Sequence, residues 1–141
     1  MSKYTDLAME RRSHFTPDGR PVYNCCQAAV SVFAEDAGFD EETAMKAATY
    51  FRGGMQTGSA CGAITGSLMA LGLSGLDDPA AANRLLREIK AQHDGMINCR
   101  DLLNASAERG EVKMVHCNGM ICDGIRCTEA ILRENGKLPD E

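Results

Sequence analysis

The residues of this chain best suited to chemistry are its cysteines, seven among 141 residues. The first ten residues lack the apolar segment of a secretory signal, so we expect a cytoplasmic protein whose thiols stay reduced. Reduced cysteines in such numbers serve metal binding or redox reactions more often than disulfide pairing. The cysteines are therefore the starting point for locating a functional site.

Four of them fall at or near the predicted N-termini of four helices, separated in sequence by 36, 38 and 23 residues. The N-terminal end of a helix carries partial positive charge and free N–H groups, and both stabilise a thiolate. Four such thiolates could converge at one end of a helical bundle. They are Cys25 after the cap Asn24, Cys61 two residues after Ser59, Cys99 after the cap Asn98, and Cys122 just before a helix predicted to begin near Asp123.

A shell of four cysteines suits an iron–sulfur cluster or a zinc ion. Zinc fits the spacing less well, because structural zinc sites usually take their ligands in close pairs. Gly58, Gly62 and Gly66 surround Cys61, and glycine lets the backbone approach a bulky inorganic group. We therefore count Gly62 among the cofactor-binding residues. The alternative is that the cysteines are inert, buried apolar residues.

The choice of the fourth ligand stays open at this point. Cys117, Cys122 and Cys127 form two C-x₄-C steps, and Cys122 is the first choice among them. Cys117 is alternatively a ligand from a loop or a resolving thiol. Cys127 lies more than a turn into the predicted helix, so we interpret it as a core residue or as a thiol without a role in the site. Cys26 falls on an apolar helix face and is assigned to the core.

Helices must position these cysteines, because aromatic residues make up only 5% of the chain and alternating β-branched runs are absent. The predicted architecture is all-α, a single-domain bundle of about five to six helices over residues 24–136. An N-terminal extension, residues 1–23, precedes it, and a C-terminal tail, residues 137–141, follows. Residues 111–120, with the turn signal Asn118-Gly119, are expected to be irregular. The predicted helices span about residues 25–37, 41–52, 59–71, 79–94, 99–109 and 123–135.

Other features bear on partners. Gly62, Gly66 and Ala70 form a stripe of small residues that lets a second backbone approach closely, either inside the bundle or across a homodimer. The net charge of -5 argues against nucleic acid as a partner. The charge-free stretch 53–76 is too polar for insertion into a membrane. Arg11-Arg12 is interpreted as an exposed charge pair.

The segment Cys61-Gly62-Ala63-Ile64-Thr65-Gly66 matches the CGAxxG motif, and on this basis the chain resembles the C_GCAxxG_C_C family of redox-active proteins. Asn24-Cys25-Cys26-Gln27-Ala28 is similar to that family's first-cysteine helix. Cys99-Arg100-Asp101-Leu102-Leu103 is similar to its third-cysteine segment. The resemblance runs in the correct order over about residues 24–132.

This resemblance implies a small helical protein whose motif cysteines hold an iron–sulfur cluster. A similar domain accompanies the haems of split-Soret cytochromes, which favours [2Fe–2S] over [4Fe–4S]. Cys25, Cys61 and Cys99 match motif positions, and Cys122 is the best match for the fourth. We therefore expect electron transfer with a protein redox partner, or redox sensing. The alternatives are a thiol–disulfide or peroxide-reactive enzyme with low-pKa cysteines, and a structural zinc-binding protein.

Overall fold

The computed structural model describes residues 2–139, and within this range the chain is helical, with two isolated β-bridges and no longer strand. The all-α prediction is confirmed, but the described residues form nine helices rather than five or six. The last two residues of the expected tail, 140–141, lie outside the described range. The helices are α1 (Lys3–Arg12), α2 (Cys25–Ser31), α3 (Ala34–Ala37), α4 (Glu41–Ala47), η1 (Gly54–Gly58), α5 (Gly62–Leu73), α6 (Pro79–Gln92), α7 (Cys99–Glu108) and α8 (Lys113–Glu134).

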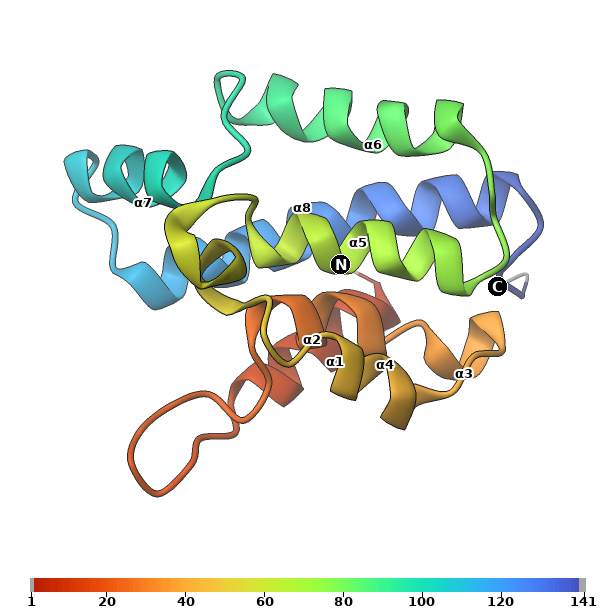
Figure 1. Ribbon diagram of the computed structural model, residues 1–141, viewed down its shortest axis with the longest axis horizontal. Coiled ribbons are helices and arrows are strands. Elements are labelled where there is room, and N and C mark those ends of the chain that lie inside the picture. Colours follow the sequence, from red (N-terminus) through yellow and green to blue (C-terminus); the bar gives the residue numbers. More distant parts are fainter. Residues whose placement is uncertain (1, 140–141) are drawn as a thin grey trace.

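Helices α5 and α8 run side by side through the middle of the molecule, with α6 and α7 on one side and α1 to α4 on the other (Figure 1). The long helix α8 contacts α1, α2, α5, α6 and α7. Its side chains Ile121, Ile125 and Ile131 are buried together with Ile64 of α5. No helix within residues 2–139 combines the length and the apolar character needed to cross a membrane.

Local capping signals begin several helices where the sequence predicts them. Asn24 and Gln27 form a reciprocal capping box at α2, with N–H to side-chain oxygen distances of 2.8 and 2.9 Å. Asp40 accepts from the Thr43 N–H at 2.9 Å and begins α4. Asp78 begins α6 ahead of Pro79. The predicted helix 25–37 is divided into α2 and α3, and it ends at Gly38 as expected.

The last helix differs most from the prediction, because α8 begins at Lys113 and not near Asp123. Residues 113–120 are therefore helical, and Cys122 lies in the middle of a helix instead of at its start. The N-cap is Val112, an apolar residue without a side-chain capping bond, so the sequence carries no start signal there. Asn118 does not mark a turn, since it lies within α8, and its side-chain oxygen accepts a hydrogen bond from the Arg12 Nε at 2.9 Å.

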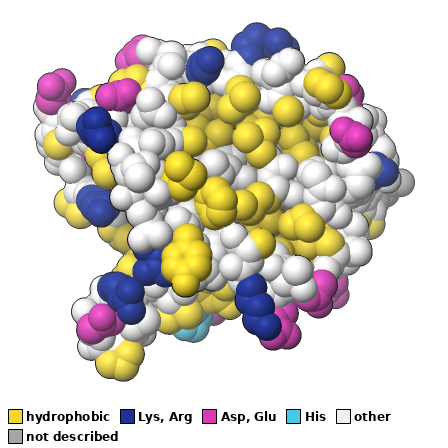
Figure 2. All heavy atoms as spheres, in the orientation of Figure 1, with side chains coloured by type: hydrophobic (Ala, Val, Ile, Leu, Met, Phe, Trp, Pro, Cys, Tyr) yellow, Lys and Arg dark blue, Asp and Glu magenta, His cyan; other side chains and the backbone are white. Residues whose placement is uncertain are grey.

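The face shared by α5 and α6 exposes apolar side chains (Figure 2). A shallow groove of about 240 Å³ lies there between the C-terminal half of α5 and the first turn of α6, lined by residues that include Leu68, Leu76 and Ala82. This groove is at the opposite end of α5 from Cys61, so it is separate from the cysteines discussed below.

The stripe of small residues on α5 faces α2 inside the bundle. A Cβ added to Gly66 would lie 2.5 Å from the Cys26 carbonyl oxygen and 2.9 Å from the Ala29 Cβ. Ala70, one turn further on, is fully buried. The stripe therefore serves packing between α5 and α2, and it gives no support to a homodimer.

We predict that Gly66→Ala lowers the free energy of unfolding by about 1–3 kcal/mol, because its Cβ meets backbone atoms that cannot move independently of α2. Gly72→Ala is the matched control on the same helix, since nothing lies within 4 Å of its added Cβ. There the change should be neutral or stabilising by up to about 1 kcal/mol. Urea unfolding of the metal-free variants measures both, and equal stabilities would contradict the packing role.

Candidate functional site

Three of the predicted site cysteines lie at helix N-termini. Cys25 is the first residue of α2, Cys61 is the N-cap of α5, and Cys99 is the first residue of α7. The thiol of Cys61 is buried, whereas Cys25 and Cys99 are half-buried. Cys25 and Cys99 thus follow their predicted caps Asn24 and Asn98, whereas the helix of Cys61 begins at Gly62 and not near Ser59, with Cys61 itself as its N-cap.

A short backbone bridge holds the segments of Cys61 and Cys99 side by side. Ala60 and Asn98 form an isolated antiparallel bridge. The Cys61 N–H donates to the Ile97 carbonyl at 2.9 Å, and the Cys99 N–H donates to the Ser59 carbonyl at 2.7 Å. Two cysteines that are 38 residues apart in sequence are therefore fixed to each other through main-chain hydrogen bonds.

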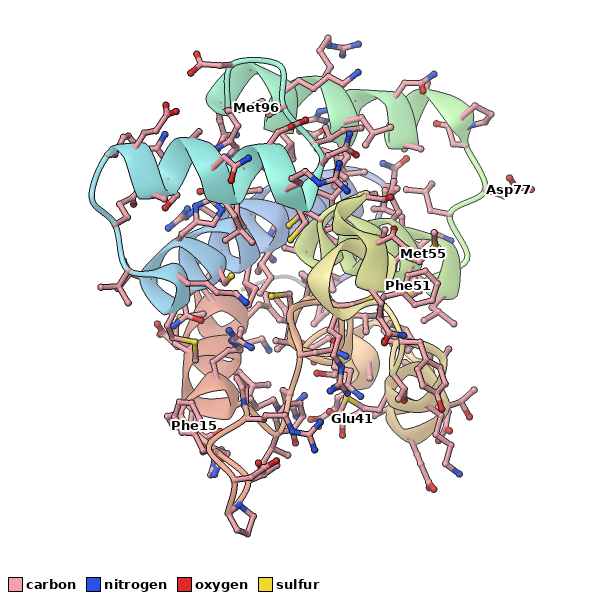
Figure 3. The ribbon with its side chains drawn as sticks, turned by 60° about the vertical axis from the view of Figure 1, so that its left-hand side comes forward. Phe15, Glu41, Phe51, Met55, Asp77 and Met96 are labelled. Carbon is pink, nitrogen blue, oxygen red and sulfur yellow. The ribbon has the colours of Figure 1, made fainter. Side chains whose placement is uncertain are left out.

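Two glycines allow the remaining segments to approach these cysteines. Gly54 belongs to a left-handed turn, with φ of 63°, and a Cβ there would lie 2.7 Å from the Cys99 Cβ. A Cβ on Gly62 would lie 3.2 Å from the Cys25 Cβ and 2.8 Å from the Phe51 carbonyl oxygen. In Figure 3 the η1 turn, near the labelled Phe51 and Met55, lies between α7 above and the layer of α1 to α4 below. The sequence singled out Gly62 but missed Gly54.

Cys117 of α8 is the fourth thiol of this neighbourhood. Its thiol donates a hydrogen bond to the Cys25 sulfur, and a negative charge on Cys117 would raise the pKa of Cys61 and Cys99. Residues 2–139 contain no three His, Cys, Asp or Glu side chains already arranged around a single metal ion. We name Cys25, Cys61, Cys99 and Cys117 the thiol cluster. These four thiols shift one another's pKa, but they are not arranged as ligands around a single metal ion.

Cys122, the first choice from the sequence, is not brought to the thiol cluster. Cys122 lies five positions after Cys117 on α8, so the two side chains point about 140° apart around the helix axis. Cys122 is buried, and the charges that act on its thiol include Arg126, Asp123 and Asp6 but none of the thiol cluster. Cys127 is buried beside Gln92 of α6 at 3.9 Å, and Cys26 packs in the core 3.6 Å from the Met69 sulfur.

The environment separates the thiols by their readiness to ionise. The hydrogen bond from Cys117, followed by the positive charge of Arg12, lowers the pKa of Cys25. The same hydrogen bond, together with burial, raises the pKa of Cys117. Burial raises the pKa of Cys61 to about 11. The backbone N–H groups of Ala63 and Ile64 act in the opposite direction, but the Cys61 side chain forms no full capping hydrogen bond with them. Burial likewise raises the pKa of Cys99.

Arg12 is a site residue that the sequence analysis missed. It was predicted to be exposed with Arg11, but only 4% of it is exposed. Its Nε donates to Asn118 at 2.9 Å, its Nη1 to the Tyr23 carbonyl at 2.8 Å, and its Nη2 contacts the Met114 sulfur at 3.1 Å. The prediction failed because it treated residues 1–23 as an extension, whereas α1 packs on α8 and α2.

A family model described as "Putative redox-active protein (C_GCAxxG_C_C)" matches residues 23–131. The chain belongs to the C_GCAxxG_C_C family. All four residues of the thiol cluster fall inside the matched range, while α1 with Arg12 lies before it. No curated protein and no solved structure is significantly similar to the chain. Membership supports a redox role and identifies no cofactor.

We predict that in the metal-free protein Cys25 reacts with iodoacetamide down to lower pH than Cys99, which is similarly half-buried. The thiolate is the reactive form, so a lowered pKa moves the inflection of the rate to lower pH. Cys117→Ala should move the inflection of Cys25 upward, because the donor is lost. Cys117→Ser keeps a donor and should leave it near the wild-type value. Mass spectrometry of alkylated peptides measures each site, and identical profiles for the two variants would refute the hydrogen bond's role.

Proposed function

We propose that this protein binds an iron–sulfur cluster through Cys25, Cys61, Cys99 and Cys117, and that it acts in electron transfer with a protein partner or in redox sensing. The observation that carries the proposal is that thiols from four helices, α2, α5, α7 and α8, lie close enough to shift one another's pKa. The family match supports the redox role. Cys117 replaces Cys122 as the proposed fourth ligand, because it is the cysteine of α8 that interacts with the other three.

The donor set fits such a group chemically. Four cysteine thiolates are the usual ligands of [2Fe–2S] and [4Fe–4S] clusters, and the family resemblance favours the first. When bound, the cluster would supply a centre that accepts and returns one electron. Gly54 and Gly62 have no side chain that would intrude between the cysteine-bearing segments. The N–H groups of Ala63 and Ile64 face the Cys61 sulfur and are suited to stabilise it as a thiolate.

The chain must give up protons to bind this group, because ligand sulfurs are deprotonated. Cys25 has the lowered pKa, so it is the first thiol able to ligate near neutral pH. The raised pKa values of Cys61, Cys99 and Cys117 mean that these thiols release their protons only as the metal binds. Uptake should therefore become faster as the pH rises from neutral.

We predict that anaerobic incubation with ferrous iron and sulfide loads the wild-type protein with both elements, seen by metal and sulfide analysis and by visible and EPR spectra. Serine substitution of Cys25, Cys61, Cys99 or Cys117 should abolish or strongly reduce loading, because serine is a poor ligand for iron in these clusters. Cys122→Ser and Cys127→Ser are matched controls on α8 and should load normally.

Three results would count against this assignment. A wild-type protein that takes up no iron and sulfide would remove the proposed cluster. Loss of loading in Cys122→Ser with normal loading in Cys117→Ser would return the fourth position to Cys122. One zinc per chain and no iron, after anaerobic purification, would favour the structural zinc site instead.

A second function is favoured by one specific contact, the hydrogen bond between Cys25 and Cys117. In the metal-free protein the Cys25 thiolate would attack one sulfur of a low-molecular-weight disulfide and release one thiolate. Cys117 would then lose its proton and attack the Cys25 sulfur, forming a Cys25–Cys117 disulfide and releasing the second thiolate. Overall, two protein thiols are oxidised and the small disulfide is reduced to two thiols.

For this second function, we predict that treatment with a low-molecular-weight disulfide lowers the intact mass of the metal-free wild-type protein by two hydrogens. Peptide mapping should then find the new disulfide between Cys25 and Cys117. In Cys117→Ser the reaction should stop at the mixed disulfide on Cys25, since the resolving thiol is gone. Pairing of Cys61 with Cys99, or no intramolecular bond at all, would exclude the Cys25–Cys117 dithiol.

A further inference from the structure

Arg12 carries a buried positive charge that forms no ion pair with a carboxylate of residues 2–139. Its three nitrogen contacts are an amide oxygen, a carbonyl oxygen and a thioether sulfur, all of them neutral. None of the ion pairs found among residues 2–139 includes Arg12. A buried charge is costly unless an opposite charge compensates it, so the position calls for an anion nearby.

The contacts of Arg12 join the two chain segments that carry Cys25 and Cys117. Tyr23, whose carbonyl accepts from Nη1, lies two residues before Cys25. Asn118, whose side chain accepts from Nε, directly follows Cys117. The guanidinium charge acts on both of these thiols, favouring their ionised forms. The candidate anions for Arg12 are therefore the thiolates of Cys25 and Cys117, or a negatively charged group that these residues hold.

We propose that Arg12 is the resident counter-charge of the cysteine site, a positioning residue supplied by α1 that stabilises negative charge on Cys25, Cys117 and the group they hold. This inference deepens the proposed function and rests on it for the loaded protein. Because a cation favours the more negative, reduced state of a redox centre, Arg12 should raise its midpoint potential. The role belongs to a residue outside the range matched by the family.

Arg11 provides a matched control one residue away. Its Nη1 forms an ion pair with Glu41 at 2.5 Å and also donates to the Ser31 hydroxyl at 2.7 Å. Removing Arg11 changes the net charge of the chain by the same amount as removing Arg12. Its charge is already balanced by a carboxylate, so it should have little effect on the cysteines.

The test compares Arg12→Gln, Arg12→Lys and Arg11→Gln with wild type after loading with iron and sulfide. In Arg12→Gln the equilibrium constant for one-electron reduction should fall about tenfold, which corresponds to a midpoint potential about 59 mV lower. Arg12→Lys keeps the charge and should recover most of the difference, whereas a purely structural role would leave both variants equally altered. Arg11→Gln should match wild type. Equal potentials in wild type and Arg12→Gln would overturn the inference.

A second measurement keeps the inference testable if the wild-type chain takes up no cluster, a result that overturns the proposed function alone. In the metal-free protein at neutral pH, alkylation of Cys25 by iodoacetamide should slow about tenfold in Arg12→Gln and recover in Arg12→Lys. Arg11→Gln should react at the wild-type rate. An unchanged rate in Arg12→Gln, with circular dichroism showing a folded chain, would overturn the role of Arg12.

Discussion

The close approach of α2 and α5 is the constraint on which the site depends. Gly66 lies over the Cys26 carbonyl and Gly62 lies over the Cys25 Cβ, so the backbones meet at distances that leave no room for a side chain. This contact fixes Cys25 beside the N-terminus of α5, where Cys61 is the cap. A second close approach joins α8 to α5, where a Cβ on Gly124 of α8 would lie 3.1 Å from the Ala63 carbonyl oxygen. Gly124 and Cys117 are seven residues apart, nearly two full turns, and share one face of α8. The packing that seats α8 on α5 therefore also directs Cys117 to the site and Cys122 away from it.

The thiol cluster combines two opposing electrostatic effects. Burial and mutual repulsion hold Cys61, Cys99 and Cys117 in their protonated forms, whereas a hydrogen bond and the charge of Arg12 favour the thiolate of Cys25. A set of four thiolates would be unstable at this depth without a cation or a metal centre among them. Of the four thiols, Cys25 alone therefore has a lowered pKa, and the other three have raised pKa values. This is why we propose both ligation and dithiol chemistry for the same residues.

The sequence predicted those parts of the site that local signals control. Asn24 and Asp78-Pro79 are strong helix-start signals, and Cys25 could be placed from its cap alone. Cys117 could not be placed, because the N-cap of α8 is Val112, which forms no side-chain capping bond and gives no start signal. The first turns of α8 are instead supported by tertiary contacts such as that of Asn118 with Arg12. An Asn-Gly pair predicts a turn from local propensity, and packing overrides that propensity here. The left-handed turn at η1 and the burial of Arg12 are likewise set by contacts between distant segments, which no single-sequence pattern records.

The thiols and the positive charge that acts on them come from different parts of the chain. The four thiols lie within the range that matches the family, and the charge that faces them comes from a helix before that range. Arg12 reaches the site through hydrogen bonds to Tyr23 and Asn118, which are neighbours of the cysteines and not the cysteines themselves. Charge can therefore be added or removed at α1 while the sulfurs keep their positions. In the proposed site, the charge that would tune the redox centre and the geometry that would hold it come from separate elements, so one could vary without rebuilding the other.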